Sequence, residues 1–530
     1  MSAILKIQGF LQTHYTTIYL YSIYLMVISL PLSRFGLSIA QLVLLGVWLL
    51  EGRYKQKLTA IFSNKALLIL ISFYLLHLIG LLYTTDFQFG LKDIRVKLPL
   101  LFLPIVFATS EPLEAYKVRS IIKIFIAATL VSTLISFGLF LVKEVSDFRN
   151  LSPFISHIRL SLNVCLAILF AGYYIYRKQI QNTNLKTAYV IAIIWFVLFL
   201  VMIESISGLF ILLFVIVVLS LYGILKLQSW ILKLSSFILV ITIPILIFLF
   251  LYYTASDFLT PHKNDLNKLE IYTEEGNPYY HDTINFWVEN GSFTGLYICQ
   301  SELREEWNKR SSLDFDGKDE KGQYLRFTLI RYLNSKELRK DARGVNSLTD
   351  MDIRYVEMGI ANVVYTQKFH INSRLYKILW EYQLAKQNDN PGGHSVIQRL
   401  EFWKTSVKII EKHPWFGVGT GDIAQAYEVQ YIEMDSKLKP EFRYRAHNQF
   451  LATFVSFGIL GLIWFLISLI YPAIALKKIF NYRYAVFWIT IMLSMLVEDT
   501  LETQMGASLY AFFNAFLLFA FIDTSANKTS

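Results

Sequence analysis

Long apolar runs recur along most of this chain, and they constrain its fold more than any other feature. An apolar run of about 18 or more residues with almost no charge can cross a bilayer as a helix. By this rule we expect about twelve spans, near residues 17–33, 35–51, 66–83, 98–108, 120–142, 155–175, 187–203, 205–225, 231–253, 447–474, 484–500 and 507–523. Only 17% of the residues are charged, against roughly a quarter in a soluble chain. The sequence therefore predicts an all-α polytopic membrane protein.

A long hydrophilic segment separates the ninth predicted span from the tenth and divides the chain into three parts. We predict an N-terminal membrane region of about nine spans at 1–253, an extracytoplasmic domain at 254–446 and a C-terminal membrane region of three spans at 447–530. The middle part is rich in aromatic and charged residues and has no Gly/Ser or Pro repeat, so we expect a folded, mainly helical domain. It ends in a predicted amphipathic helix, VIQRLEFWKTSVKIIEKHPW, and a glycine-rich turn.

Basic clusters in the short loops predict the orientation of the spans. Lys and Arg gather at 53–57, 117–123, 177–179, 226–233 and 477–483, which all lie on one side of a twelve-span model. By the positive-inside rule this side is cytoplasmic, which places both termini in the cytoplasm and the middle domain outside. The formal charge of +10 is explained by these loops and needs no nucleic-acid partner. We also expect the first run to remain as a span, because it lacks a cleavage pattern.

The tenth span begins at a polar junction, RYRAHNQF, that carries candidate site residues. His447 and Asn448 stand where the chain enters the membrane, and Arg443 and Arg445 directly precede them. Histidine can hold or accept a proton near neutral pH, and arginine can bind phosphate through two parallel hydrogen bonds. The alternative is that the arginines anchor the helix at the headgroups and that His447 caps it.

Three further basic residues lie at outer ends of predicted spans. Arg159 stands at the mouth of the sixth span, and an arginine at membrane depth usually faces a cavity or a partner. Snorkelling of its long side chain to the interface is an equal alternative. Arg95 and Lys97 precede the short run 98–108, where they either face a bound anion or pair with Asp86 or Asp93, and pairing is the favoured interpretation.

A glycine cluster, FGVGTGD at 416–422, supplies Gly419 and Asp422 as further candidates. Glycines allow backbone N–H groups to converge on an anion. The motif lacks the strand and βαβ context of a dinucleotide fingerprint, and a tight turn is the favoured interpretation.

The sequence indicates neither a metal nor another cofactor. The nine histidines are scattered, without the spacing of a metal site. Cys165 lies in an apolar run and Cys299 in the hydrophilic segment, so we expect no disulfide. The acids Glu498, Asp499 and Glu502 are expected to serve as counter-ions or interface anchors. Arginines and a histidine at membrane depth suit a lipid-linked sugar pyrophosphate, whose tail stays in the bilayer.

Two stretches resemble the core pattern of the O-antigen ligase and polymerase superfamily of membrane glycosyltransferases. They are RLEFWKTSVKIIEKHPWFGVGTGD and, after about two dozen residues, RAHNQFLATFVSFGILGL. The segments HIRLSLNVCLAI, TLIRYLNSKELRKDA and VEDTLETQMGASLYAFFNAFLL look like the O-antigen ligase-like subgroup with a long outer insertion. The resemblance thus covers most of the chain.

This resemblance implies a metal-independent, inverting transferase of about twelve spans that acts on the periplasmic face of the bacterial inner membrane. Its donor would be an undecaprenyl-pyrophosphate-linked glycan, and its acceptor a hydroxyl of lipid A-core or another surface glycan. The resemblance implies that His447 activates or orients that hydroxyl and that Arg159, Arg399 and Arg445 hold the pyrophosphate. In one departure, many members carry an SRxG-type arginine where this chain reads ESISG, with Ile206 at that position.

We therefore predict an O-antigen ligase-type glycosyltransferase. The alternatives are a polysaccharide polymerase, a protein O-glycan ligase and, from another class, a transporter for the same lipid, which would show inverted repeats. The predicted catalytic residues are His447 and Arg159. The predicted substrate-binding residues are Arg399, Arg445, Arg443, Asn448, Gly419, Asp422, Arg95 and Lys97.

Overall fold

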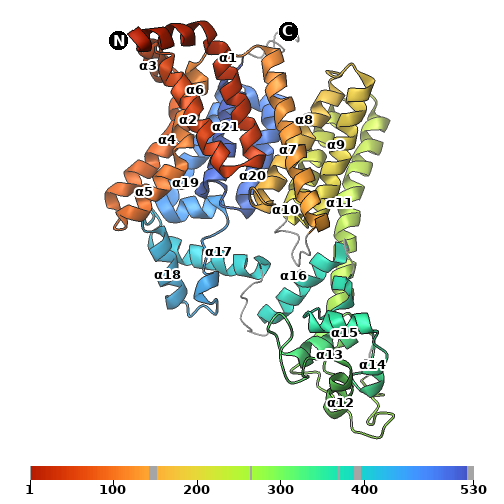
Figure 1. Cartoon of the computed structure of the whole chain (residues 1–530). Coiled ribbons are helices and arrows are strands. Elements are labelled where there is room, and N and C mark those ends of the chain that lie inside the picture. Colours follow the sequence, from red (N-terminus) through yellow and green to blue (C-terminus); the bar gives the residue numbers. More distant parts are fainter. Residues whose placement is uncertain (1, 143–151, 263–265, 367–370, 387–394, 522–530) are drawn as a thin grey trace. The chain divides into compact units, whose positions relative to one another are not determined.

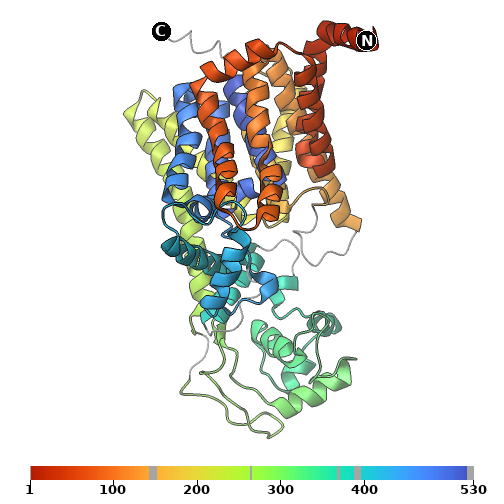
Figure 2. The ribbon, with the colours of Figure 1, turned by 90° about the vertical axis from the view of Figure 1, so that its left-hand side faces the viewer.

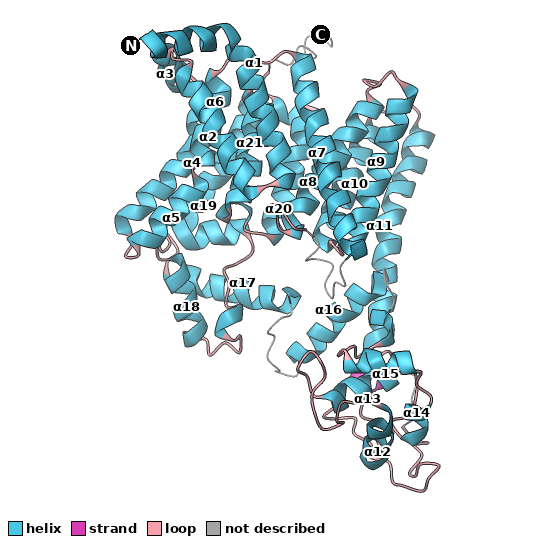
Figure 3. Cartoon of the chain, in the orientation of Figure 1, coloured by secondary structure: helices cyan, strands magenta, loops and turns pink. Residues whose placement is uncertain are grey.

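Helices make up almost all of the regular structure in the computed structural model of this chain (Figure 3). The structure describes residues 2–142, 152–262, 266–366, 371–386 and 395–521. It is 73% helical, and its strands are the two-residue pair β1 (Val288–Glu289) and β2 (Ser292–Phe293). The prediction of an all-α polytopic membrane protein is confirmed.

The chain forms two compact units. The first joins residues 1–220 to 399–530, and the second comprises residues 221–398. Residues 399–446, which we had grouped with the outer domain, therefore fold together with the helices on either side of the insertion.

The first unit is a bundle of long apolar helices that lie side by side (Figures 1 and 2). Its N-terminal helices are α1 (Ser2–Leu32), α2 (Arg34–Leu50), α3 (Tyr54–Ser63), α4 (Lys65–Gly80), η1 (Leu81–Tyr83), α5 (Phe87–Lys97), α6 (Pro99–Thr109), α7 (Ala115–Val142), α8 (His157–Tyr176), α9 (Thr183–Met202) and α10 (Ile206–Leu225). Its C-terminal helices are α17 (Ser395–Lys412), α18 (Ile423–Glu433), η4 (Pro440–Phe442), α19 (Gln449–Ala475), η5 (Lys478–Phe480), α20 (Tyr482–Val497), η6 (Thr500–Glu502) and α21 (Gln504–Phe519).

Aromatic side chains form much of the centre of this bundle. Phe125 of α7, Phe170 of α8 and Phe513 of α21 are buried and contact one another at ring-centroid distances of 4.9 to 6.4 Å. Aromatic rings bury a large area and favour edge-to-face contacts, which fixes how neighbouring helices pack. As a result α8 and α21 lie deep inside the unit, and the residues at their outer ends are held in place.

Eight of the described helices are long and apolar enough to cross a membrane. They are His14–Leu32, Lys65–Tyr83, Ala115–Val142, His157–Tyr176, Thr183–Met202, Ile206–Leu225, Trp230–Leu259 and Gln449–Ala475. Each of the other four predicted runs also contains a helix, but a shorter one: α2 has 17 residues, α6 has 11, and α20 and α21 have 16 each. The multi-pass prediction is confirmed, and the count of about twelve stays a prediction.

The second unit has its own apolar core around Trp307, Leu329 and Tyr332, which are fully buried. Its helices are α11 (Trp230–Leu259), α12 (Gln300–Arg310), α13 (Leu325–Ser335), α14 (Ala342–Asn346), α15 (Asp350–Glu357), η3 (Val363–Thr366) and α16 (Ile371–Lys386).

Helix α19 is broken at Gly458, and the segment with the glycine-rich motif forms hydrogen bonds with the backbone on both sides of the break. Gly458 has φ 64° and ψ −167°, so two helical segments meet there at a break. The carbonyls of Val455 and Ser456 accept hydrogen bonds from the N–H groups of Val418 and Gly419, both at 2.9 Å. The N–H of Ile459 donates to the carbonyl of Pro414 at 2.8 Å. Backbone groups freed by the break are therefore satisfied, as a membrane environment demands.

Candidate active site

Three acids between α20 and α21 form the centre of a buried charged cluster. Glu498, Asp499 and Glu502 lie in and beside the single turn η6, and their side chains are 5–11% exposed. The amide of Gln449, the first residue of α19, holds this turn at two points. It accepts from the N–H of Leu501 at 2.7 Å and donates to Glu502 at 3.0 Å. Buried carboxylates need such partners, because an unpaired buried charge is strongly destabilising.

Cations from α17 and from the segment before α19 surround these acids. Arg399 Nη2 lies 2.7 Å from Glu498 Oε1, and Arg445 Nη1 lies 3.1 Å from Glu502 Oε2. The other terminal nitrogen of Arg445 lies 4.0 Å from Asp499. Two arginines far apart in the sequence are thus brought to one group of acids.

His447 joins the same cluster from the end of the segment before α19. Its Nδ1 lies 3.4 Å from Glu498 Oε2 and 3.6 Å from Asp499 Oδ1. Its φ of 45° falls in the left-handed region, which a non-glycine residue adopts at a cost of about 1–3 kcal/mol. The flanking residues secure this conformation: the carbonyl of Ala446 accepts from the indole of Trp403 at 2.9 Å, and Asn448 donates to the carbonyl of Leu496 at 2.9 Å.

The two carboxylates control the charge of His447. Burial by itself would lower the pKa of the ring, but its contacts with Asp499 and Glu498 outweigh burial and raise the pKa to about 9. His447 therefore carries a proton at neutral pH when the site is empty of substrate. A cationic imidazole donates hydrogen bonds from both nitrogens and accepts none.

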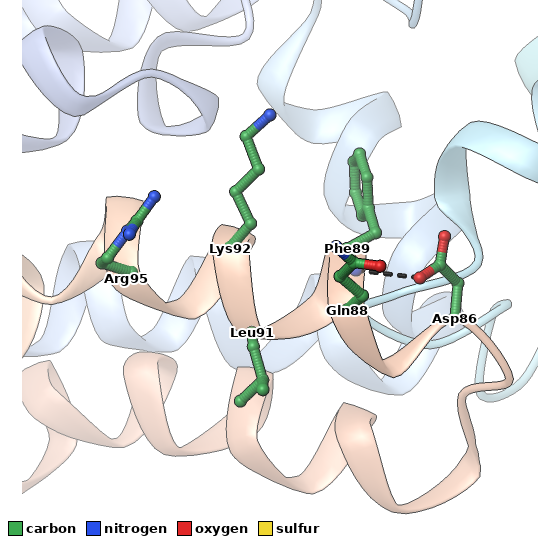
Figure 4. Close-up of a pocket in the computed structure, with 6 residues that line it drawn as sticks. All are labelled: Asp86, Gln88, Phe89, Leu91, Lys92 and Arg95. Atoms are coloured by element: carbon green, nitrogen blue, oxygen red, sulfur yellow. Dashed lines mark hydrogen bonds between the residues drawn. The ribbon is translucent and has the colours of Figure 1, made fainter.

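Helix α5 adds a second ion-pair group to the cluster. Lys97 Nζ lies 2.6 Å from Asp93 Oδ2 and 2.7 Å from Glu502 Oε2, and the lysine side chain is 1% exposed. Burial would raise the pKa of Glu502, but the charges of Lys97 and Arg445 outweigh it and hold this pKa far below its usual range. Of the two interpretations of Lys97, the structure contains the pairing with Asp93. Arg95 extends elsewhere and lines a pocket on α5 (Figure 4).

Arg159 in the first turn of α8 is buried beside the acids. A small cavity is lined by Ile158 and Ser161 of α8 together with Val497 and Glu498, so the start of α8 lies against the end of α20. Glu498 and Asp499 are the acids that act on Arg159 through space. Its Nη1 is buried and has no hydrogen-bond partner among the described residues. An unsatisfied buried guanidinium nitrogen is costly, so it marks a position where a ligand oxygen would be favourable.

The remaining predicted residues stand apart from the cluster or support it from outside. Arg443 pairs with Glu428 of α18 at 2.7 Å and donates to the carbonyl of Leu438. Asn448 caps α19 by accepting from the N–H of Leu451 at 3.0 Å. Whether these residues contact substrate stays a prediction.

Gly419 and Asp422 lie in a tight connection to α4 and α5. The N–H groups of residues 417–421 all donate to protein oxygens, so none of them is free to cradle an anion. Asp422 accepts from the N–H groups of Thr85 and Asp86 at 2.7–2.9 Å and from the hydroxyl of Thr84 at 3.0 Å. Burial would raise the pKa of Asp422, but these hydrogen bonds outweigh it and lower the pKa. This geometry fits the tight-turn interpretation.

The sequence did not predict that His447, Glu498 and Asp499 share a site. Their ligand atoms lie within 4.8 Å of one another, a spacing that could hold a metal ion. Arg399 and Arg445 contact the same carboxylates and already balance their charge, which favours an ion-pair network over a cation site. The group of acids at 498–502 was the sequence signal that could have revealed this site. The sequence analysis expected these acids to be counter-ions or interface anchors but did not say which cations they contact.

One region of the chain matches a known protein family. Residues 357–466 match the family model described as O-antigen ligase, and no curated protein matches the chain. The matched range includes Arg399, Arg445 and His447, together with the broken first half of α19. This part of the chain is therefore similar to the O-antigen ligase family, which supports membership of that superfamily.

Proposed function

We propose that this protein transfers a glycan from undecaprenyl pyrophosphate to a hydroxyl of lipid A-core or another surface acceptor. The family match supports a membrane glycosyltransferase-like enzyme. The observation that carries the finer proposal is the gathering of Arg159, Arg399, Arg445 and His447 around the buried acids, with one guanidinium nitrogen of Arg159 unsatisfied among the described residues. Arginine matches the oxygens of a pyrophosphate, and fixed cations stabilise the charge that develops as it departs.

In this mechanism the acceptor oxygen forms a bond to the anomeric carbon while the bond from that carbon to the pyrophosphate oxygen breaks. The electron pair stays on the departing pyrophosphate, and the three arginines and the cationic His447 stabilise it. The hydroxyl proton passes to a carboxylate. Asp499 is suited to this role, because its contacts with His447 and Arg445 are longer, at 3.6 and 4.0 Å, than those that hold Glu498. The raised pKa of His447 thus favours an electrostatic role over the base that the resemblance implied.

The active site would face the periplasm in a multi-pass protein of the inner membrane, with both termini in the cytoplasm. The basic loops of the sequence support this orientation. In the structure, the start of α1 and the end of α21 lie at the end of the bundle opposite to α17 and α18 (Figures 1 and 2). This arrangement fits a charged cluster on the outer side.

A gel of surface glycolipids from a strain that lacks the gene tests the proposal. A ligase predicts lipid A-core without glycan and an accumulation of long undecaprenyl-linked chains. Core with a single repeat unit would instead establish a polymerase, which shares the donor and the site. An unchanged pattern would direct attention to glycoproteins as acceptors and then to the transporter alternative.

A further inference from the structure

Helix α5 presents a basic pocket on the face opposite to its ion pairs. Asp93 and Lys97 are buried within the charged cluster, whereas Lys92 and Arg95 are exposed. The pocket is lined by Asp86, Gln88, Phe89, Leu91, Lys92 and Arg95. Figure 4 shows Phe89, Lys92 and Arg95 extending from the same side of the helix, as their spacing of three residues requires.

The two cations of this pocket lack acidic partners. Among the described residues, neither Lys92 nor Arg95 forms an ion pair, although most basic side chains of the neighbouring cluster do. Asp86, the acid of the lining, is used elsewhere: its carboxylate accepts from the N–H of Phe89 at 2.9 Å and caps α5. Asp86 keeps its negative charge, but Lys92 and Arg95 outnumber it, so the lining is positive on balance, which suits a phosphate group.

Apolar residues beside these cations indicate that the phosphate belongs to a lipid. Phe87, Leu91 and Leu98 of this segment are 53%, 50% and 40% exposed, and Phe89 lines the pocket. A helix with exposed apolar residues and basic residues near them lies at a membrane interface, where Lys and Arg reach the headgroups. A ligand that satisfies both features carries a phosphate at headgroup level and an acyl chain in the bilayer.

We propose that this pocket binds a phosphate of the glycolipid acceptor and so holds the acceptor next to the reaction centre. The inference rests on the proposed glycosyl transfer. The cations of the cluster are engaged with acids or reserved for the donor pyrophosphate, so the acceptor must be held by other groups. Lys92 and Arg95 meet this need, because the buried face of the same helix contacts Glu502 through Lys97.

The test uses the full chain in nanodiscs of phosphatidylcholine and compares K92Q/R95Q with K404Q/K408Q. The control pair removes two exposed cations from α17, outside the pocket. We expect K92Q/R95Q to raise the KM for phosphorylated lipid A-core about tenfold, with an unchanged KM for the donor, and the control to leave both unchanged. With dephosphorylated acceptor, wild type and K92Q/R95Q should have the same KM, because the interaction that the variant removes is already absent.

Two results would overturn the assignment. One is an equal KM for the phosphorylated and the dephosphorylated acceptor in wild type and in K92Q/R95Q. The other is a transfer rate that changes with added phosphatidylglycerol in wild type but not in K92Q/R95Q, while the KM for the acceptor is the same in both. That result would identify a membrane phospholipid as the occupant. Direct binding of labelled lipid A-core without donor separates this inference from the proposed function. If no transfer occurs but K92Q/R95Q weakens the binding of lipid A-core, the proposed transferase activity is refuted and the acceptor pocket is supported.

Discussion

The Nδ1 atom of His447 lies 3.4 Å from a carboxylate oxygen of Glu498, which links the charge of the histidine to that of the acid. We expect Glu498→Gln to lower the pKa of His447 from about 9 toward the ordinary 6.5. If the cation stabilises the leaving group, wild-type transfer persists at neutral pH and declines as pH rises through about 9. In the variant, the same decline with rising pH should begin at a lower pH. Transfer rates between about pH 6 and 10 check this, with the exposed Glu411→Gln as control. A wild-type rate that increases from neutral pH to 9 would indicate a neutral histidine base.

The same shift has a consequence for stability. The folded-state pKa of His447 lies above its ordinary value, so protonation favours the folded chain. This contribution is complete below about pH 6.5, decreases above it and is lost as pH rises through about 9. Thermal unfolding of wild type and His447→Ala should therefore differ in pH dependence within this window, and parallel curves would contradict the raised pKa.

Arg159→Lys should abolish most transfer, although the positive charge is kept. A lysine ammonium lacks the planar fork of the guanidinium, and it ends short of the buried Nη1 position. Loss of one such donor to a developing anion costs about 10²- to 10³-fold in rate. The matched control is Arg177→Lys at the exposed far end of α8, which should retain normal activity and accumulation. Full activity of Arg159→Lys would favour a side chain that merely reaches the membrane surface.

Gly458→Ala should destabilise the protein strongly. A Cβ at this position would lie 2.2 Å from the backbone of Trp415, and the φ of 64° disfavours any side chain. The expected loss is about 2 kcal/mol or more, measured as a lower Tm in detergent. Gly138→Ala in α7 meets open space and should not lower the Tm, because alanine favours a helix more than glycine does. Equal melting of the two variants would mean that the break in α19 is not required.

Transfer should be unchanged in excess chelator. Glu498 and Asp499 contact Arg399 and Arg445, so the acids near His447 are balanced without an added cation. Activity that is lost in chelator and restored by a divalent ion would assign a metal to the group of His447, Glu498 and Asp499.

The sequence predicted the helices well because long apolar runs have one stable form in a bilayer. It also named Arg399, Arg445 and His447 as candidates, and the structure brings these three residues to one group of acids. It did not predict their partners, because Glu498 and Asp499 follow His447 by about fifty residues and reach it only through the packing of α19 against α20. The role of Gly419 could not be predicted either. Its N–H donates to the carbonyl of Ser456 beside the break in α19, which follows Gly419 by about forty residues.

The hydrogen bonds from residues 414–419 to α19 also have a consequence for how the protein inserts into the membrane. These residues leave the ribosome before α19, so the groups that satisfy Val455, Ser456 and Ile459 already exist when that helix enters the bilayer. An α19 that inserted without them would expose open backbone groups to lipid, which is strongly unfavourable. The stable insertion of α19 therefore depends on residues 414–419, which precede this helix in the chain.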